Sequence, residues 1–366
     1  MKFEEMNINR DIIDILEKRE IFEPTEIQRL SLPLIEEGRD VIGQSETGSG
    51  KTLAFAIPIV EKVEKGRGIQ ALILTPTREL ANQIENELGK IASFKSLRIT
   101  NIHGGVPIMP QIDNLKVADI VVGTPGRILD HVRRGTIDFS NVKYMVIDEA
   151  DRMMDMGFID DVEKIIKETP ANRQTMLFSA TIPSEVKRLS RRYMKNPEMV
   201  ITNRMVDPSL LNQYYLEGEG REKLRMLARL LKEDEPEKCL VFTNTRIMAD
   251  NVARDLRSMG FRANVLHGGL TQSRRDRIMA DFRKGKIKVL VATDVASRGL
   301  DVKSITHIFN YDVPSRAEDY IHRIGRTARA GKEGKAITLL SRRDHAPFRR
   351  ILKEFNLSIK RMGRQI

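Results

Sequence analysis

Short apolar runs alternate with longer stretches of helical periodicity along the whole chain. The apolar residues of 79–91, for example, recur every three or four positions, as on one face of a helix. Because strands that alternate with helices form parallel sheets covered on both faces, we predict an α/β protein. The expected strands lie at 40–44, 71–75, 119–122, 144–148 and 175–179, and after residue 206 at 240–244, 288–292, 307–310 and 336–340.

The length of 366 residues indicates two domains, since one domain typically takes roughly 150 residues. The stretch 196–213 carries Pro197 and Pro208 and no helical periodicity, as a connection between domains would. We therefore predict a first domain over 1–203, a linker over 204–209 and a second domain over 210–366.

Cysteine and hydropathy limit the kind of protein. Cys239 is the single cysteine, so an intramolecular disulfide and a cysteine metal cluster are excluded, and its apolar surroundings favour a small buried side chain over a reactive thiol. The chain has no apolar run of about 18 residues, and its first ten residues do not resemble a signal peptide. We expect a soluble, cytoplasmic protein without a membrane partner.

Charge is distributed unequally between the two halves. Residues 1–206 hold 29 Lys and Arg against 31 Asp and Glu, whereas residues 207–366 hold 33 against 20. The whole excess of +11 therefore comes from the second half. A solvated basic surface would account for it, but an excess this lopsided favours a polyanionic partner.

Residues 45–52 read SETGSGKT and stand between an expected strand and an expected helix. This is the context of a phosphate-binding loop, although Ser45 stands where the usual pattern has glycine. Gly48 and Gly50 allow backbone N–H groups to turn toward a β-phosphate. Lys51 would reach the β- and γ-phosphates, and the Thr52 hydroxyl would bind Mg²⁺. A flexible glycine-rich turn without a ligand is the alternative.

The expected strand at 144–148 ends in a group of carboxylates, Asp148, Glu149 and Asp151. Gathering these charges is costly without a cation, which favours a metal at the end of the strand. Asp148 would hold Mg²⁺, and Glu149 would orient or deprotonate the attacking water. An acidic turn that opens a helix is the alternative, but a phosphate loop about a hundred residues upstream argues against it.

Residues 148–151 spell DEAD, and the chain resembles the DEAD-box family of ATP-dependent RNA helicases, in superfamily 2, from end to end. The resemblance implies tandem RecA-like domains, each a mostly parallel sheet flanked by helices, with ATP and Mg²⁺ as cofactors and RNA as partner. Within FEPTEIQ (22–28), it implies that Phe22 stacks on adenine and Gln28 reads its edge. It also implies nucleotide contacts from the whole loop: Ser45, Glu46, Thr47, Gly48, Ser49, Gly50, Lys51 and Thr52.

Further motifs resemble the RNA contacts of this family. Their hydroxyl, backbone N–H and guanidinium groups suit phosphate and sugar, which gives binding with little base specificity. Each motif alone is also ordinary turn chemistry. The resemblance implies RNA contacts by Pro76, Thr77, Arg78, Gly104, Gly105, Thr124, Pro125, Gly126 and Arg127 in the first domain, and by Thr243 and Thr293 in the second.

Other residues are assigned to communication between domains and to the γ-phosphate. The resemblance implies that Gly299 and Asp301 contact the nucleotide and that Arg326 and Arg329 are arginine fingers, while QSRR (272–275) resembles a further RNA element. The spacing of Arg323, Arg326 and Arg329 would gather them on one helix face, for which a solvated basic face is the alternative. By resemblance, coupling between sites falls to Asp151, Ser179, Thr181, Arg298, His322 and Arg323.

The chain departs from the family pattern at Ser45, Glu46, Ile21 and Ala328, none of which removes a charged or metal-binding group. The resemblance implies that the two domains close on ATP and single-stranded RNA, bend the strand, unwind short duplexes locally and reopen after hydrolysis. Two alternatives remain: an ATP-timed RNA clamp or annealing protein with little unwinding, and a DNA-acting helicase of superfamily 2.

Overall fold

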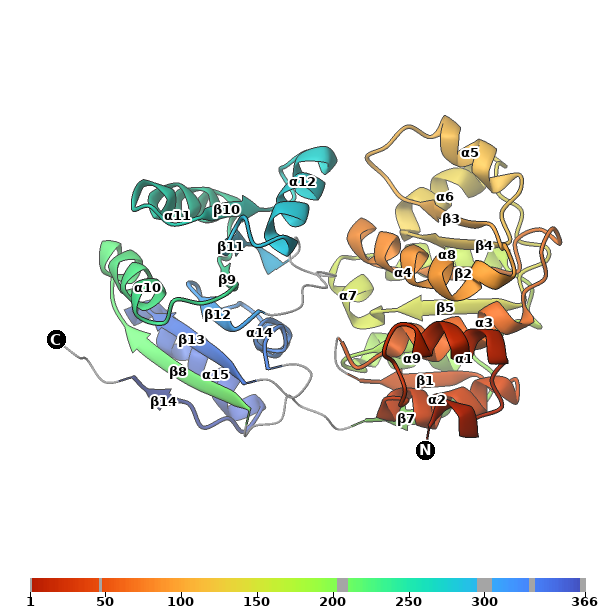
Figure 1. Ribbon diagram of the computed structural model, residues 1–366, viewed down its shortest axis with the longest axis horizontal. Coiled ribbons are helices and arrows are strands. Elements are labelled where there is room, and N and C mark those ends of the chain that lie inside the picture. Colours follow the sequence, from red (N-terminus) through yellow and green to blue (C-terminus); the bar gives the residue numbers. More distant parts are fainter. Residues whose placement is uncertain (1, 46–47, 203–209, 295–304, 329–332, 363–366) are drawn as a thin grey trace. The chain divides into compact units, whose positions relative to one another are not determined.

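The computed structural model describes residues 2–45, 48–202, 210–294, 305–328 and 333–362. The chain forms two compact units, Met1–Asn203 and Arg204–Ile366. Each unit contains a parallel sheet covered by helices on both faces (Figure 1), so the α/β fold predicted from the sequence is confirmed. The predicted linker 204–209 lies outside the described residues, and its limits stay a prediction.

The sheet of unit 1 contains seven described strands in the order β3-β4-β2-β5-β6-β1-β7, paired in parallel throughout. All carboxyl ends of its strands therefore meet at one edge, where ligands of such folds bind. The strands are β1 (Val41–Gln44), β2 (Ala71–Leu74), β3 (Ile99–Ile102), β4 (Ile120–Gly123), β5 (Tyr144–Asp148), β6 (Gln174–Ser179) and β7 (Glu198–Ile201).

Two groups of helices cover the two faces of this sheet. One face packs on α1 (Arg10–Glu17), α2 (Glu26–Glu36), α3 (Lys51–Lys62) and α4 (Arg78–Ile91). The other packs on α5 (Met109–Leu115), α6 (Pro125–Arg133), α7 (Ala150–Asp155), α8 (Ile159–Glu168) and α9 (Ser184–Tyr193). Successive residues of a strand point into the hydrophobic cores on opposite faces of the sheet. Ile73 packs toward α3 and α4, whereas Leu72 and Leu74 pack toward the second group of helices.

Unit 2 repeats this architecture with seven described strands in the order β10-β11-β9-β12-β13-β8-β14, again paired in parallel. The strands are β8 (Leu211–Glu217), β9 (Cys239–Phe242), β10 (Ala263–Leu266), β11 (Val289–Ala292), β12 (His307–Asn310), β13 (Gly334–Leu340) and β14 (Lys360–Arg361).

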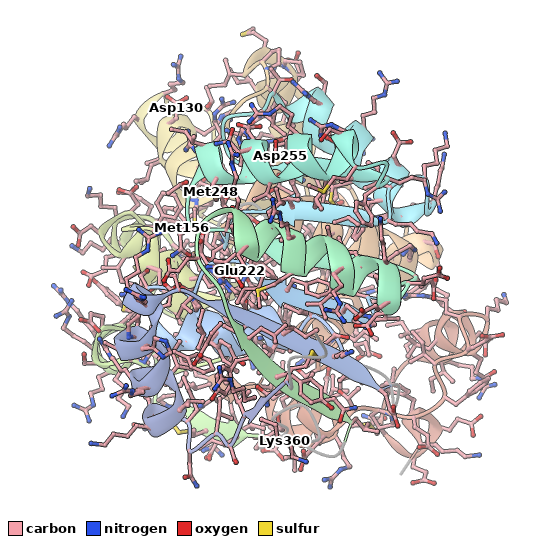
Figure 2. The ribbon with its side chains drawn as sticks, turned by 90° about the vertical axis from the view of Figure 1, so that its left-hand side faces the viewer. Asp130, Met156, Glu222, Met248, Asp255 and Lys360 are labelled. Carbon is pink, nitrogen blue, oxygen red and sulfur yellow. The ribbon has the colours of Figure 1, made fainter. Side chains whose placement is uncertain are left out.

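Helices also cover both faces of the second sheet. One face packs on α12 (Gln272–Arg283), α14 (Ala317–Ile324) and α15 (His345–Glu354), and the other on α10 (Arg221–Glu233) and α11 (Arg246–Ser258). Glu222 and Met248 mark the first turns of α10 and α11 in Figure 2, and both turns lie toward the same edge of the unit. That edge is where the carboxyl ends of the parallel strands meet.

Cys239 is buried in β9, as its sequence setting predicted, and burial raises the pKa of its thiol. No helix in the described part of the chain is long and apolar enough to cross a membrane. The cytoplasmic location expected from the sequence stays a prediction.

Candidate nucleotide and RNA sites

The phosphate loop joins β1 to α3 at the carboxyl edge of the first sheet. Gly48 and Gly50 have φ angles of 88° and 92°, a left-handed conformation that favours glycine. Ser45 is not among the residues with positive φ, so its side chain does not strain the turn. The Ser45 N–H donates to the Ser179 carbonyl at 3.0 Å, and Lys51 Nζ donates to the Ser45 carbonyl at 2.9 Å. Lys51 is thus held inside the loop.

Gln28 connects the segment FEPTEIQ (22–28) to this loop, a contact that the sequence did not predict. Its Oε1 accepts the Thr25 N–H at 2.9 Å, closing a capping box at the start of α2, and its Nε2 donates to the Gly50 carbonyl at 2.9 Å. A Cβ on Gly50 would lie 2.4 Å from Gln28 Nε2. Phe22 is 57% exposed, so its ring is free to stack on a base.

The carboxylates Asp148, Glu149 and Asp151 are all buried at the end of β5. Burial raises the pKa of Asp148 to about 7; Lys51 opposes this shift and Glu149 adds to it. Glu149 adopts a left-handed backbone (φ 53°) at the turn into α7, which is uncommon for a residue with a side chain. The left-handed turn places two carboxylates side by side at the edge that carries the phosphate loop.

Asp151 connects the end of β5 to the end of β6. Its N–H donates to Ser179 Oγ at 3.0 Å, and its Oδ2 accepts both the N–H and the hydroxyl of Thr181 at 2.9 Å. The three residues predicted to couple the sites in unit 1 are thus brought into one hydrogen-bonded group. Their coupling role itself stays a prediction.

The donors around Asp148 fit a magnesium ion that is shared with a nucleotide. No group of three or more His, Cys, Asp or Glu in the described parts of the chain could hold a metal by itself. Mg²⁺ usually takes only one or two carboxylates and completes its shell with substrate phosphates and water. Buried Asp148 and the half-buried Thr52 in the first turn of α3 supply this type of donor set.

The predicted RNA contacts of unit 1 come together in three neighbouring loops after β2, β3 and β4. The guanidinium of Arg78 lies so close to Gly105 that a Cβ there would be 1.9 Å from it, and it also borders Gly104. Arg127 donates to the Val106 carbonyl at 3.2 and 3.3 Å. The two arginines therefore flank one glycine loop.

Other residues of these loops take part in helix capping. Thr77 Oγ1 accepts the Leu80 N–H at 3.3 Å at the start of α4, and Pro76 beside it is buried. Thr124 precedes Pro125 in the first turn of α6, and nothing would contact a Cβ on exposed Gly126. The loops therefore place two guanidinium groups beside the backbone of residues 104–106.

Unit 2 repeats this local structure after β9 and β10. Thr245 caps α11 by accepting the Met248 N–H at 3.1 Å, and Arg246 borders Gly268 and Gly269 as Arg78 borders its glycines. Arg246 was not predicted. The sequence does carry the signal, because Thr-x-Thr-Arg followed by His-Gly-Gly occurs at 75–78 with 103–105 and again at 243–246 with 267–269. Thr243 and Thr293, which were predicted, are buried at the ends of β9 and β11.

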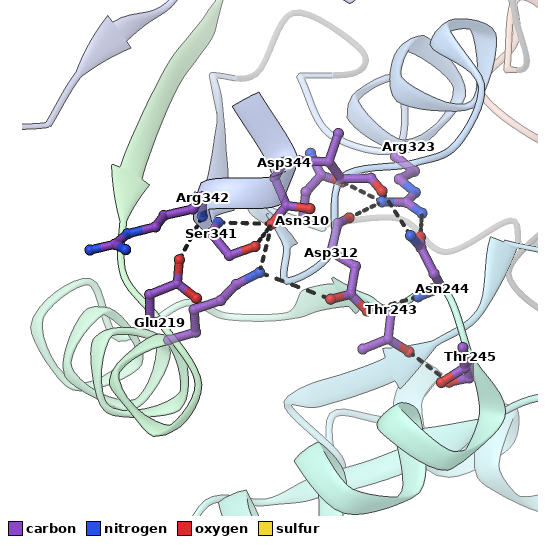
Figure 3. Close-up of polar contacts among 12 residues, drawn as sticks. Glu219, Thr243, Asn244, Thr245, Asn310, Asp312, Arg323, Ser341, Arg342 and Asp344 are labelled. Atoms are coloured by element: carbon purple, nitrogen blue, oxygen red, sulfur yellow. Dashed lines mark hydrogen bonds and ion pairs between the residues drawn. The ribbon is translucent and has the colours of Figure 1, made fainter. Parts of the chain in front are cut away.

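Arg323 is buried at the centre of a polar network within unit 2 (Figure 3). Its two bonds to Asp294 measure 2.6 and 2.7 Å, and further bonds reach Asn244, Asn310 and the Asp312 carbonyl. These contacts use all five guanidinium N–H groups. The arrangement joins the ends of β9, β11 and β12, which is a structural role beyond the coupling role predicted for Arg323.

The predicted helix face with Arg323, Arg326 and Arg329 is wrong in part. Helix α14 ends at Ile324 with Gly325 as its cap, and the described chain then turns, with Ala328 at a φ of 54°. Arg326 is buried in this turn, and His322 lies half-buried within α14. Glu46, Thr47, Arg298, Gly299, Asp301 and Arg329 lie outside the described residues.

Tandem RecA-like domains with a phosphate loop and a carboxylate group at the edge of the first sheet define the class of two-domain helicase motors. Two family models match, the DEAD/DEAH box helicase over residues 25–189 and the helicase conserved C-terminal domain over 222–331. The chain therefore belongs to the DEAD-box family of ATP-dependent RNA helicases, as the sequence resemblance indicated, and is an ATP-hydrolysing enzyme.

Similar proteins include the ATP-dependent RNA helicase CshA of Listeria monocytogenes, 46% identical over 96% of this chain and 68% of the relative. A probable ATP-dependent RNA helicase of Methanocaldococcus jannaschii is 44% identical over 99% of this chain and 98% of its own. Among solved structures, S. cerevisiae Dbp5 bound to RNA and ADP BeF3 matches with a TM-score of 0.90, 30% identity and coverage of 98% and 95% of the two chains.

Proposed function

We propose that this helicase binds single-stranded RNA between its two units when ATP is bound, bends the strand and locally unwinds short duplexes. The main support is the common edge of the first sheet. The phosphate loop after β1, the carboxylates after β5 and the glycine loop flanked by Arg78 and Arg127 all follow carboxyl ends of parallel strands. Nucleotide and RNA would therefore bind to loops of one rigid sheet.

On the nucleotide side, Phe22 stacks on adenine and Gln28 reads its edge, while the phosphate loop and Lys51 hold the phosphates. Thr52 and Asp148 would hold Mg²⁺, which neutralises phosphate charge. Glu149 accepts the proton of the attacking water or orients it. Arg326 and Arg329 of unit 2 supply positive charge to the γ-phosphate, so hydrolysis requires the closed state.

On the RNA side, the contacts are to phosphates and sugars. In unit 1 the loops with Arg78 and Arg127 bind the backbone, and in unit 2 Thr243, Thr293 and Arg246 do so. Contacts of this kind read the 2′-hydroxyl and the strand geometry, which favours RNA over DNA with little base specificity. The basic excess of residues 207–366 supports a polyanionic partner.

The hydrogen bonds of Asp151 to Ser179 and Thr181 support a coupling between the two sites. A shift of the acidic turn on nucleotide binding would be passed to the loop after β6 through these bonds. Closure is then favoured by ATP and by RNA together, and phosphate release reopens the units.

The test is steady-state ATP hydrolysis with single-stranded RNA, with single-stranded DNA and with neither, for the parent and for Glu149→Gln. We expect strong stimulation by RNA alone and its loss in Glu149→Gln. Strand separation of a short RNA duplex under ATP is then compared with annealing. Equal stimulation by DNA would favour a DNA-acting helicase, and annealing in excess of separation would favour an ATP-timed clamp.

A further inference from the structure

Arg152, which has no role in the proposed mechanism, lies next to the carboxylate of Glu149. It is the third residue of α7 and 1% exposed, one of the largest side chains of the chain that are fully buried. Arginine stays protonated even when buried, so this side chain brings a permanent positive charge into the acidic turn. Burying such a charge is costly unless a partner compensates it.

The partner that the described residues offer is Glu149. Arg152 Nη1 lies 3.3 Å from Glu149 Oε2, and the two side chains are 2% and 4% exposed. The contact lacks hydrogen-bond geometry: among the described protein groups, Nη1 and Nη2 of Arg152 and Oε2 of Glu149 have no hydrogen-bond partner. The pair is therefore held by charge rather than by a bidentate hydrogen-bonded fork.

The charge balance of the acidic turn shows why this pair matters. Three buried carboxylates, Asp148, Glu149 and Asp151, share the end of β5 with two buried cations, Lys51 and Arg152. Lys51 donates to the Ser45 carbonyl in the phosphate loop and acts on Asp148. Arg152 is the cation paired with Glu149. Without it, Glu149 would face Asp148 as a like charge in a buried site.

We propose that Arg152 is the positioning residue of Glu149: its guanidinium, 3.3 Å from the carboxylate, holds that side chain in the acidic turn and aims it at the attacking water. This inference rests on the proposed function of Glu149 in hydrolysis. Arg152 does not touch the nucleotide in this scheme, so its removal affects the chemical step and leaves ATP binding intact. A misplaced base costs up to about 100-fold in rate.

The experiment measures kcat and the KM for ATP at saturating single-stranded RNA in the full chain. For Arg152→Gln we expect kcat to fall at least about tenfold while KM changes less than about twofold. Arg152→Lys keeps the charge and should restore most of the rate. Arg192→Gln is the matched control, because Arg192 pairs with Glu163 at 3.2 Å on the surface, and its kcat should equal that of the parent.

A double-mutant cycle separates action through Glu149 from a general effect on the fold. If Arg152 works through Glu149, single-turnover hydrolysis by Glu149→Gln should slow less than about twofold when Arg152→Gln is added. An unchanged kcat in Arg152→Gln, a loss that appears in KM, or losses that multiply in the double variant would overturn the inference alone. Full activity in Glu149→Gln would overturn the catalytic assignment and the inference with it.

Discussion

At the scale of single residues, Gln28 makes two hydrogen bonds, one to Thr25 and one to Gly50, and a conservative change separates them. Gln28→Glu keeps the acceptor for the Thr25 N–H but sets a carboxylate against the Gly50 carbonyl, where the amide now donates. Two acceptors repel, so we expect the phosphate loop to loosen and the KM for ATP to rise at least about tenfold, because a lost buried hydrogen bond costs about 1–3 kcal/mol.

Titration of ATP in the hydrolysis assay measures this effect. Glu26→Gln, an exposed change in the first turn of the same helix, is the control and should leave the KM unchanged. An unaltered KM in Gln28→Glu would show that the bond to Gly50 does not hold the loop.

Ala328 is a second residue for which we predict the effect of a substitution, because its backbone conformation favours glycine. Its φ of 54° is left-handed, a conformation that costs a non-glycine residue roughly 1–2 kcal/mol. A glycine at this position would avoid that cost, but part of the gain in stability is offset by the larger entropy of glycine in the unfolded chain. We expect Ala328→Gly to raise the free energy of unfolding by up to about 1 kcal/mol.

Urea unfolding measures this free energy. Ala253→Gly serves as the control with the opposite sign, because Ala253 is buried within α11, where glycine destabilises by roughly 0.5–1 kcal/mol. A loss of stability in both variants would show that the turn at Ala328 gains nothing from glycine.

We expect His131 to give the stability of unit 1 a dependence on pH. Burial lowers the pKa of His131, Arg127 and Arg134 add to the shift, and Asp130 opposes it. Below the ordinary pKa of about 6.5, the ring of His131 binds a proton in the unfolded chain but stays neutral in the folded chain. The free energy of unfolding therefore decreases as pH falls from this value toward the folded pKa. His131→Gln removes the titrating ring, and we expect Tm to drop less between about pH 7.5 and about pH 5.5.

Thermal unfolding at both pH values checks this for the parent and for the variant. Thr136 and Gln111, the hydrogen-bond partners of the ring, should still be satisfied by the glutamine amide. Equal pH dependence in the two proteins would mean that other groups carry the effect.

At the scale of elements, the central strands were predictable because both faces are buried. Strand β2 reads ALIL and is buried at every position. Strand β3 lies at the sheet edge, reads ITNI and is buried only at alternate positions, so its sequence gives a weak signal. The turn that ends α14 was missed for another reason, since HRIGRTAR keeps an arginine at every third position beyond the last helical residue.

The candidate site shows the same division. The phosphate loop and the acidic turn were predictable because each is a local motif with a strand before it and a helix after it. The bond from Gln28 to Gly50, the pairing of Arg152 and the network of Arg323 depend on side chains that only the fold brings together. Residue types alone do not reveal such contacts.

The network of Arg323 leads to a prediction about the packing of three strands. Lysine has three donors on one nitrogen and does not reproduce the planar fork that bonds Asp294 twice. We expect Arg323→Lys to lower the stability of unit 2 by about 1.5–3 kcal/mol, because a lysine with three donors leaves at least two of the five hydrogen bonds to buried groups unmade. Arg225→Lys, at an exposed position of α10, should have no effect.

Calorimetry of the full chain measures this change. The thermal transition that shifts should be the one in which β9, β11 and β12 unfold. Amide hydrogen exchange of these three strands identifies that transition. Unchanged exchange in Arg323→Lys would mean that the network does not stabilise the unit.

At the scale of the whole molecule, the proposed clamp would couple the binding of two ligands, ATP and RNA. The loop between β1 and α3, which we propose binds the nucleotide, belongs to unit 1, whereas the basic excess lies in residues 207–366. If both ligands favour the same closed state, each must tighten the other by the same factor, because the coupling free energy is reciprocal. A coupling of typical size corresponds to about 5-fold to 150-fold in affinity.

This reciprocity is measured with a non-hydrolysable ATP analogue and a short single-stranded RNA, each titrated with and without the other. We expect both affinities to rise by one common factor of at least about five. Asp151→Asn should reduce that factor toward one while each ligand still binds alone, because an amide in place of the carboxylate disturbs the bonds from Thr181. A factor of one in the parent protein would mean that ATP and RNA bind without favouring a common state, and the clamp would have to be abandoned.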